Sequence, residues 1–343
     1  MQRKPTSFDI AQLAGVSQPT VSRALRGSPT VSMATRKRIE AIAHQLHYTV
    51  DRAASNLRSG QTRTLALLLF RDPSPDDTVV NPFFLGMLGS IMSACAAEGY
   101  DLLISFQQMS SDWHVDYEDS HRADGVILLG YGDYAAYRAR LDQLVAQGTH
   151  FVRWGSVRAG QPGLTVGCDN VAGGHAATRH LIAHGRTRIA FLGDATHHYP
   201  EFQDRHRGYA EALSDAGLTV DPRLQVDAIS TEEDGTRAAR QLLARGVAFD
   251  AIVAASDMIA LAAMRVLAEA GLTVPDAIAL VGFDDIPAAG LANPPLTTVA
   301  QDVGVAGRRL VDMLLARVRG EPVDSRVLPT HLVVRRSSGT PQP

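Results

Sequence analysis

The chain has 343 residues, 45% hydrophobic and 20% charged, a composition typical of a folded protein with two or three domains. Its longest apolar run, 65–70, is far too short to span a membrane, and its first residues lack the apolar stretch of a secretory signal. The two cysteines, Cys95 and Cys168, make neither a disulfide framework nor a four-ligand zinc site. We therefore expect a cytoplasmic protein.

The formal net charge of −3 conceals an uneven distribution along the chain. The first 64 residues hold ten basic and three acidic side chains, a charge of +7, and the remainder carries −10. A small basic segment joined to a large acidic one indicates that the basic segment binds a polyanion, although a solvated basic surface would have the same composition.

Residues 1–48 predict three short helices. Thr6 begins a variant of the capping box before the first helix, and Gly15 ends that helix because a tight turn needs a residue that tolerates positive φ. Ser17 can cap a second helix, and Ser32 can cap a third.

Residues 9–25, DIAQLAGVSQPTVSRAL, have the pattern of a helix-turn-helix, whose second helix enters the major groove of DNA. The side chains that this helix would present outward are Gln18, Pro19, Ser22 and Arg23. Arginine can grip guanine and glutamine can read adenine, whereas Ser17 and Thr20 suit phosphate oxygens. An ordinary helical hairpin is the alternative, and the charge of +7 argues against it.

Residues 49–63 are polar and basic, and we interpret them as a linker with a conditional helix. From residue 64 onward apolar strands alternate with amphipathic helices, which predicts parallel, doubly wound α/β sheets divided between two lobes. The expected strands are 64–70, 101–106, 125–129, 150–154, 188–193, 250–255 and 278–283. The expected helices include 83–98, 171–184, 204–216, 235–245, 257–270 and 303–318.

These segments resemble the lactose-repressor (LacI/GalR) family of bacterial transcription regulators. The resemblance rests on DIAQLAGVSQPTVSRAL, VSMATRKRIEAIAHQLHY and DRAASNLRSGQT, and in the remainder on NPFF (81–84), RHRGYAEAL (205–213), the stretch 255–285 that ends in VGFDD, and PPLTTVAQD (294–302). It implies a small all-α helix-turn-helix head (1–48), a hinge (49–63) and an α/β core of two doubly wound, periplasmic-binding-protein-like lobes (64–343) that binds an effector and dimerises.

The resemblance also implies a role for the hinge. Leu57 matches the family's leucine that wedges into the minor groove at the operator centre, and Ala54 lies on the same face. Leu57 can equally pack on a partner's hinge, and the two roles are compatible. The candidate DNA-binding residues are thus Thr6, Ser17, Gln18, Pro19, Thr20, Ser22, Arg23, Ala54 and Leu57.

In the core, the resemblance implies an effector site between the lobes. The candidate effector-binding residues are Phe83, Phe84, Trp154, Asp169, Arg205, Ser256 and Asp284. Arg205 matches a residue that reaches the effector's polar groups, Asp284 matches an acceptor for its hydroxyls, and the Trp154 indole can stack on a sugar. Alternatively, Asp284 caps a turn, Arg205 is solvated and the two phenylalanines belong to the core.

The function thus implied is that of a homodimeric, nucleoid-associated repressor in the bacterial cytoplasm, released from a palindromic operator by a sugar-like effector. An activator or a corepressor-dependent repressor would use the same parts. A sugar-modifying enzyme or a transport binding protein would need catalytic residues or a signal peptide, and neither is visible. The G-x-G-x-x-A at 130–135 lacks the acidic residue of a dinucleotide site, and His180 and His184 lack a third zinc ligand. We therefore expect no enzyme activity, no cofactor and no metal.

Overall fold

The computed structural model describes residues 5–25, 27–48, 61–70, 80–107, 111–130 and 132–339. The chain forms two compact units, Met1–Thr62 and Arg63–Pro343. In the described segments, no helix combines the length and the apolar character that a membrane span needs.

The N-terminal unit contains the helices α1 (Ser7–Ala14), α2 (Gln18–Leu25) and α3 (Met33–Gln45). The predicted capping box is present: the Asp9 N–H donates to Thr6 Oγ1 at 3.4 Å, and the Thr6 N–H donates to Asp9 Oδ2 at 2.7 Å. Gly15 ends α1 with φ at 63°, and Ser32 Oγ caps α3 by accepting the N–H of Thr35 at 3.2 Å. The sequence prediction of this unit is therefore confirmed at each of these three helix ends.

The three helices enclose a small hydrophobic core. Ile10 of α1, Val21 of α2 and Ile39 of α3 are completely buried there, and the half-buried Val16 of the turn packs against them. These buried residues hold one side of α2 against the core, so the opposite side of α2 faces solvent.

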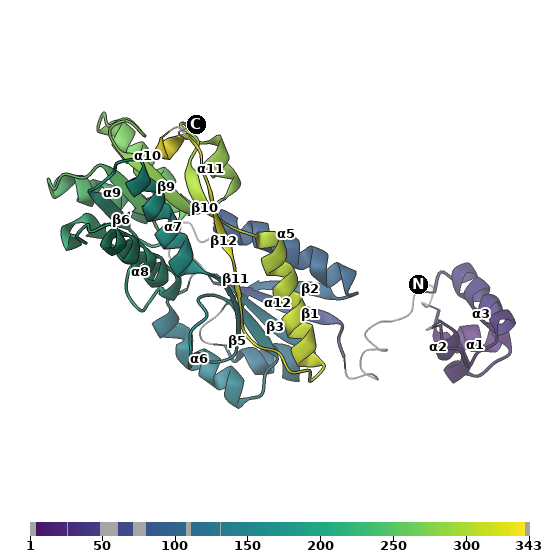
Figure 1. The fold of residues 1–343 in the computed structure, drawn as a ribbon. Coiled ribbons are helices and arrows are strands. Elements are labelled where there is room, and N and C mark those ends of the chain that lie inside the picture. The colour runs from purple at the N-terminus through teal and green to yellow at the C-terminus, as the bar shows by residue number, and fades with distance from the viewer. Residues whose placement is uncertain are drawn as a thin grey trace. The chain divides into compact units, whose positions relative to one another are not determined.

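The described part of the C-terminal unit contains two six-stranded sheets, with the strand orders β11-β5-β4-β3-β1-β2 and β12-β10-β9-β8-β6-β7 (Figure 1). The first consists of β1 (Thr64–Leu69), β2 (Asp101–Phe106), β3 (Gly125–Leu129), β4 (Phe151–Trp154), β5 (Leu164–Cys168) and β11 (Arg326–Leu328). The second consists of β6 (Ile189–Leu192), β7 (Gln225–Val226), β8 (Ala251–Ala254), β9 (Ala279–Asp284), β10 (Thr297–Gln301) and β12 (Thr330–Val333). Neighbouring strands are parallel, except that β12 runs antiparallel to β10.

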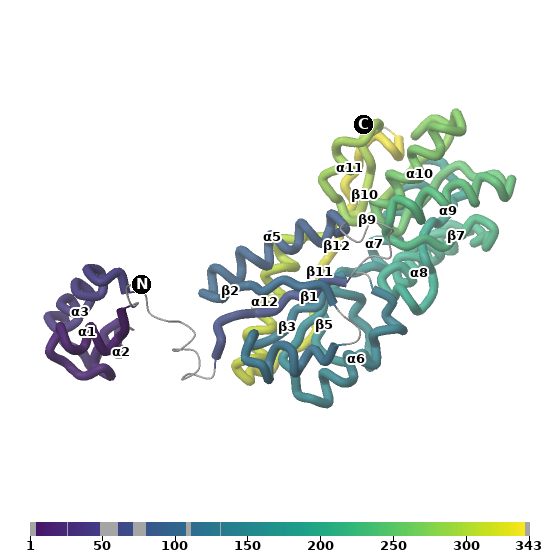
Figure 2. Tube along the Cα trace, turned by 180° about the vertical axis from the view of Figure 1, so that it is seen from behind, coloured from purple at the N-terminus to yellow at the C-terminus, as the bar shows by residue number. Residues whose placement is uncertain are grey.

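Helices cover the sheets: α5 (Pro82–Ala97), α6 (Tyr134–Ala146), α7 (Asn170–Ala183), α8 (Pro200–Asp215), α9 (Glu232–Ala244), α10 (Asp257–Glu269), α11 (Pro287–Leu291) and α12 (Val303–Val318). The chain passes between the lobes from β5 to α7, from β10 to α12 and from β11 to β12. Figure 2 shows α12, late in the chain, lying beside the early helix α5, where Ser90 Oγ donates to the Gly304 carbonyl at 2.9 Å. Two α/β lobes joined by three crossings confirm the expected fold class.

Several elements differ from the sequence prediction. The strands β5, β7, β10, β11 and β12 and the helix α11 were not predicted. β10 begins with two threonines, and β11 and β12 are half-exposed segments on either side of Pro329, so none of them shows the apolar run of a central strand. The segment 107–123, which suggested neither helix nor strand, contains one π-helical turn, Val115–Asp119.

The position of α8 depends on two glycines. A Cβ on Gly174 of α7 would lie 2.1 Å from the Arg205 carbonyl oxygen, and a Cβ on Gly208 of α8 would lie 2.0 Å from the Val171 carbonyl oxygen. Only glycine permits the two helix backbones to approach this closely. The contact fixes α8, and with it Arg205, against the helix that follows the first crossing.

Candidate functional site

The side of α2 that faces solvent carries the residues expected to read DNA. Pro19 and Arg23 are exposed and stand one turn apart, so they lie on one face of the helix, and Ser17 is exposed just before its start. The Ser17 hydroxyl pairs with the Thr20 hydroxyl at 2.9 Å, and the Ser17 carbonyl accepts the Thr20 N–H. This surface has the form that a major-groove reading helix requires.

The other candidate residues of the N-terminal unit are less exposed. Gln18, Thr20 and Ser22 are half-buried, and Gln18 Nε2 donates to Ser7 Oγ at 3.2 Å, so this amide is tied to α1. The Thr6 hydroxyl is engaged by Asp9 Oδ2 at 2.7 Å within the capping box. Ala54 and Leu57 lie outside the described residues.

In the C-terminal unit, Arg205 of α8 and Asp284 at the end of β9 meet in the interior. Both side chains are only 1% exposed, and Arg205 Nη1 lies 3.4 Å from Asp284 Oδ1. Arg205 also donates from Nε to Asn170 Oδ1 at 2.8 Å and from Nη1 to the Ala255 carbonyl. The alternative of a solvated arginine therefore does not hold, because the guanidinium is buried and bonded to three different elements.

Asp284 is itself held in an unusual conformation. Its φ is 117° and that of Asp285 is 53°, both in the region that disfavours side chains with a Cβ. Gln301 Nε2 donates to Asp284 Oδ1 at 2.6 Å, and Arg335 Nη2 pairs with Asp285 Oδ1 at 2.7 Å. Asp284 thus ends a strand in a strained turn, and its carboxylate accepts from side chains of α8 and β10, so it does more than cap that turn.

A third carboxyl group, that of Asp257, lies close to this pair. Asp257 accepts hydrogen bonds from Thr298 Oγ1 at 2.6 Å and from the Ile286 N–H at 2.9 Å. Burial, followed by the nearby Asp284 carboxylate, raises the pKa of Asp257 well above its usual value. Asp257 therefore keeps its proton to a higher pH than an ordinary aspartate does.

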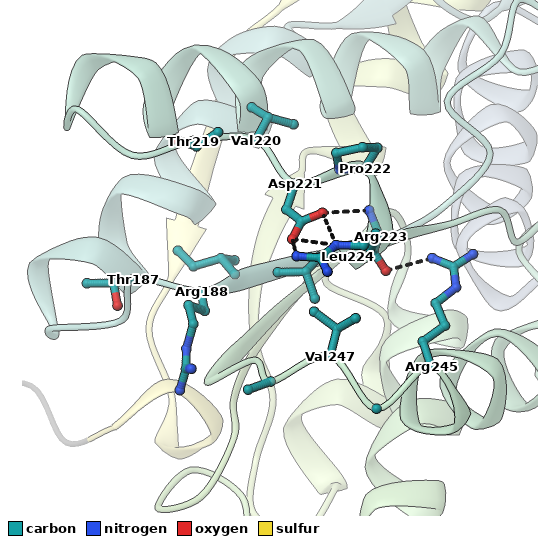
Figure 3. A pocket seen from close by; sticks show the side chains of 13 residues that line it. Thr187, Arg188, Thr219, Val220, Asp221, Pro222, Arg223, Leu224, Arg245 and Val247 are labelled. Carbon is teal, nitrogen blue, oxygen red and sulfur yellow. Dashed lines mark hydrogen bonds and ion pairs between the residues drawn. The ribbon is translucent and has the colours of Figure 1, made fainter.

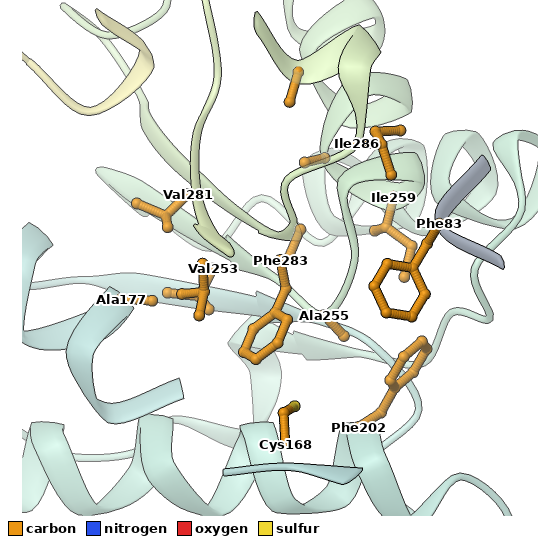
Figure 4. Packing of buried hydrophobic residues seen from close by; sticks show 14 of the residues in the cluster. Phe83, Cys168, Ala177, Phe202, Val253, Ala255, Ile259, Val281, Phe283 and Ile286 are labelled. Carbon is orange, nitrogen blue, oxygen red and sulfur yellow. The ribbon is translucent and has the colours of Figure 1, made fainter. Parts of the chain in front are cut away.

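Aromatic rings surround the guanidinium of Arg205. Its central carbon lies 3.7 Å from the centroid of the Phe283 ring and 5.2 Å from that of Phe202, distances at which a cation and a ring attract each other. Phe83, from α5 of the other lobe, points toward Phe202 (Figure 4), and its ring centroid lies 6.0 Å from that of Trp154. Rings from both lobes therefore converge beside the Arg205–Asp284 pair.

A chain of hydrogen bonds joins the lobes next to these rings. Asn81 Oδ1 caps α5 by accepting the Phe83 N–H at 3.0 Å, while Asn81 Nδ2 donates to Ser230 Oγ at 2.8 Å. Ser230 Oγ in turn donates to Ser256 Oγ at 2.8 Å. Ser256, a candidate effector residue, is fully buried and caps α10 through the Ile259 N–H at 3.4 Å. Ser256 is thus linked to the opposite lobe through Ser230 and Asn81.

Two candidate effector residues lie differently from the rest. Asp169 is exposed at the first crossing and caps α7 by accepting the Ala172 N–H at 2.9 Å. Phe84 is buried against Phe83, with ring centroids 5.2 Å apart. Phe83, Trp154, Arg205 and Asp284 therefore lie together, and Ser256 is connected to them through Ser230 and Asn81. Asp169 is exposed to solvent at the first crossing.

Sequence reasoning did not identify several residues of this cluster. These are Asn81, Asn170, Phe202, Ser230, Phe283 and Gln301. Spacing could have indicated the two phenylalanines, because Phe202 is one helical turn before Arg205 and Phe283 directly precedes Asp284. Ser230 and Gln301 carry no comparable signal, since their partners are distant in sequence.

A separate pocket of about 800 Å³ lies at the amino ends of β6 and β7, away from this cluster (Figure 3). Two of its arginines are engaged by the protein: Arg223 Nη2 pairs with Asp221 Oδ2 at 2.8 Å, and Arg245 Nη1 donates to the carbonyls of Arg223 and Gln225 at 2.7 Å. Among all the residues that the structure describes, no three His, Cys, Asp or Glu side chains are grouped so that they could hold a metal ion.

Comparison with known proteins relates both units to one kind of regulator. Residues 8–51 match the model of bacterial regulatory proteins of the lacI family, and residues 178–338 match that of a periplasmic binding protein-like domain. The chain is 34% identical to the HTH-type transcriptional regulator CelR of Thermobifida fusca, over 98% of this chain and 99% of that protein. It is 30% identical to the HTH-type transcriptional repressor CytR of Escherichia coli K12, over 97% and 96%.

Solved structures agree with these relatives. The chain resembles the complex of the regulator CelR with cellobiose, with a TM-score of 0.73 and 33% identity over 97% of this chain and 99% of that chain. It also resembles the lac repressor dimer bound to operator and the anti-inducer ONPF, with a TM-score of 0.84 and 25% identity over 98% and 100%.

Proposed function

We propose that this chain, which belongs to the LacI family of bacterial regulatory proteins, represses transcription by binding a palindromic operator. Repression would take place on the nucleoid, in the bacterial cytoplasm. A small sugar-like effector bound in the C-terminal unit would release the operator. The observation that carries this proposal is that one chain combines an exposed reading face on α2 with a buried, aromatic-lined Arg205–Asp284 pair. Both activities are binding events, and neither needs a catalytic group.

The proposed division of labour follows the two units of the chain. Residues 1–48 would bind the half-sites, 49–63 would form the hinge with Ala54 and Leu57 at the operator centre, and 64–343 would bind effector and dimerise. The boundary between the compact units at Thr62 and Arg63 supports this division.

The chemistry of the core supports an uncharged effector. The Arg205 cation and the Asp284 anion are paired and buried together, so the pair offers polar atoms without net charge. The rings of Phe83, Trp154 and Phe202 offer apolar faces beside it, which suit the C–H face of a sugar. We therefore favour a neutral sugar over a sugar phosphate, and the relative CelR in its cellobiose complex is consistent with that choice.

The proposed dimer would use the uncharged helix α5. Leu85, Gly89, Met92 and Ala96 are exposed at intervals of three or four residues, which aligns them along one face of the helix. Leu85 and Met92 are about half-exposed, unusual for such side chains, and α5 has no Asp, Glu, Lys or Arg. A self-complementary apolar face of this kind fits a two-fold partner.

A binding screen tests the effector assignment. A thermal-shift series with neutral mono- and disaccharides, their phosphates, and purines should raise the melting temperature for one neutral sugar, because a ligand that binds only the folded state stabilises it. That sugar should then weaken binding to an operator selected from random duplex DNA. Stabilisation by a sugar phosphate alone would contradict the choice of a neutral effector.

A further inference from the structure

The loop that follows β4 in the first lobe contacts the start of α8 in the second lobe. Ser156 N–H donates to Glu201 Oε1 at 2.8 Å, and Ser156 Oγ donates to Asp204 Oδ2. Arg158 binds Asp204 through both carboxylate oxygens, with Nη2 2.8 Å from Oδ1 and Nε 3.2 Å from Oδ2. Two carboxylates of one lobe thus meet an N–H, a hydroxyl and a guanidinium of the other.

Arg158 extends this contact along the first turn of α8. Its Nη1 donates to Gln203 Oε1 at 2.9 Å, and its Nη2 donates to the Pro200 carbonyl at 2.7 Å. Behind it, Gln161 Oε1 accepts from the Arg158 N–H at 3.2 Å and from Nη2 of the fully buried Arg153 at 2.6 Å. The loop is therefore braced from within its own lobe while Arg158 reaches across.

The residues that make these cross-lobe hydrogen bonds are buried, which makes the bonds costly to break. Ser156 is 2% exposed, and Glu201 and Asp204 are each 7% exposed. Charge-assisted and bidentate hydrogen bonds are stronger than neutral ones, and a carboxylate at this depth is costly to leave without partners. If the lobes separated, Glu201 and Asp204 would lose these partners together and would have to be hydrated instead.

The same two segments carry the candidate effector residues. Trp154 is two residues before Ser156, and Arg205 directly follows Asp204. On α8, Asp204 faces the loop of the first lobe while Arg205 faces Asp284 and Phe283. A shift of α8 relative to the loop would therefore move both sets of contacts at once.

We propose that Ser156, Arg158, Glu201 and Asp204 form a cross-lobe lock that holds the two lobes together in this arrangement without any effector. The lock sets the balance between joined and separated lobes, and an effector must act on that balance to change the state of the protein. The lock itself follows from the contacts alone, and only its regulatory consequence rests on the proposed function.

The distance between the lobes tests the lock directly, in the full-length protein and without DNA or effector. Spin labels at Asp142→Cys on α6 and Glu233→Cys on α9 report on one exposed site in each lobe. Burial raises the pKa of the native Cys95 to about 11 and that of Cys168 to about 12, so these buried thiols stay unlabelled. Labelled chains are mixed with an excess of unlabelled protein, so that distances within one chain are measured.

The key variant is Arg158→Ala, and its matched control is Arg207→Ala. Arg207 also pairs with Asp204, at 3.4 Å, but it belongs to α8 itself and is 61% exposed, so its removal takes a cation from Asp204 without breaking a cross-lobe bond. We expect a second, longer distance population in Arg158→Ala and a single population in wild type and Arg207→Ala.

Three results would overturn the lock: one unchanged distance in all three proteins, a longer population in wild type as well, or a longer population in Arg207→Ala equal to that in Arg158→Ala. If Arg158→Ala fails to fold, Ser156→Ala serves as the test variant, since it removes one cross-lobe hydroxyl and no charge. The readout involves neither operator nor effector, so its outcome is separate from that of the proposed function.

Discussion

The N-terminal unit and the core hold their candidate functional residues in opposite ways. On α2, Pro19 and Arg23 stand in solvent and a hydrophobic core on the other side of the helix supports them. In the core, Arg205 and Asp284 are buried, bonded to each other and to neighbouring elements, so they contribute to the fold as well as to the candidate site. A substitution on α2 should therefore alter recognition alone, whereas one at the buried pair should alter recognition and stability together.

The largest effect should follow from Asp284→Ala. It leaves the Arg205 guanidinium buried without its anion, which should lower the free energy of unfolding by about 3–5 kcal/mol and abolish effector binding. Its matched control is Asp285→Ala in the same turn, because that carboxylate pairs with Arg335 at side-chain exposures of 27% and 23%. Urea unfolding followed by calorimetry separates the two losses. Equal stability of the two variants would contradict the comparison.

Dimerisation should depend on one face of the core. Met92→Asp places a charge on the uncharged face of α5 and should convert the dimer to monomers, with a corresponding loss of operator affinity because a monomer covers one half-site. Val145→Asp on α6 is the control, since Val145 and Met92 are both 51% exposed. Sedimentation velocity at micromolar concentration distinguishes them, and a dimeric Met92→Asp would show that α5 is not the interface.

Arg23→Ala should act on DNA reading without affecting stability. If Arg23 grips a guanine through two hydrogen bonds, its loss should reduce discrimination at one position of each half-site by about 1–3 kcal/mol. Arg38→Ala, at an exposed arginine of α3, should leave base preference unchanged. Binding to a panel of single-base operator variants provides the measurement, and unchanged base preference in Arg23→Ala would contradict the assigned role.

The smallest effect should come from the helix cap. Thr6→Ala removes the hydroxyl that accepts the Asp9 N–H, which should destabilise the start of α1 by about 1 kcal/mol. Amide hydrogen exchange in α1 should quicken accordingly. Thr30→Ala, whose exposed hydroxyl pairs with Ser28, is the control and should leave that exchange unchanged. Equal exchange in both variants would show that the cap contributes little.

Sequence reasoning succeeded where the signal was local. The bounds of α12, the cap at Thr6 and the turn at Gly15 depend on residues within a few positions of one another, and each agrees with the structure. The short strands β5 and β10 were missed because their sheet neighbours, and not their own composition, make them strands.

The same distinction applies to the candidate site. Motif positions indicated Arg205 and Asp284, and the structure brings the two together. The partners that bury and orient them were not predictable, because Asn170 is 35 residues from Arg205 and Gln301 is 17 residues from Asp284. The cross-lobe contact of Arg158 with Asp204 spans 46 residues and belongs to the same class. Buried polar networks are fixed by tertiary packing, which one sequence does not reveal.

The central claim is that the core binds an effector whose binding changes the affinity of the α2 face for DNA. The most direct test is a titration of full-length protein against an operator selected from random duplexes, with and without the sugar found by thermal shift, for wild type and Asp284→Asn. We expect the sugar to weaken wild-type binding by roughly 5- to 150-fold and to leave the variant's affinity unchanged. Equal weakening in both proteins, or no change in wild type, would contradict the account.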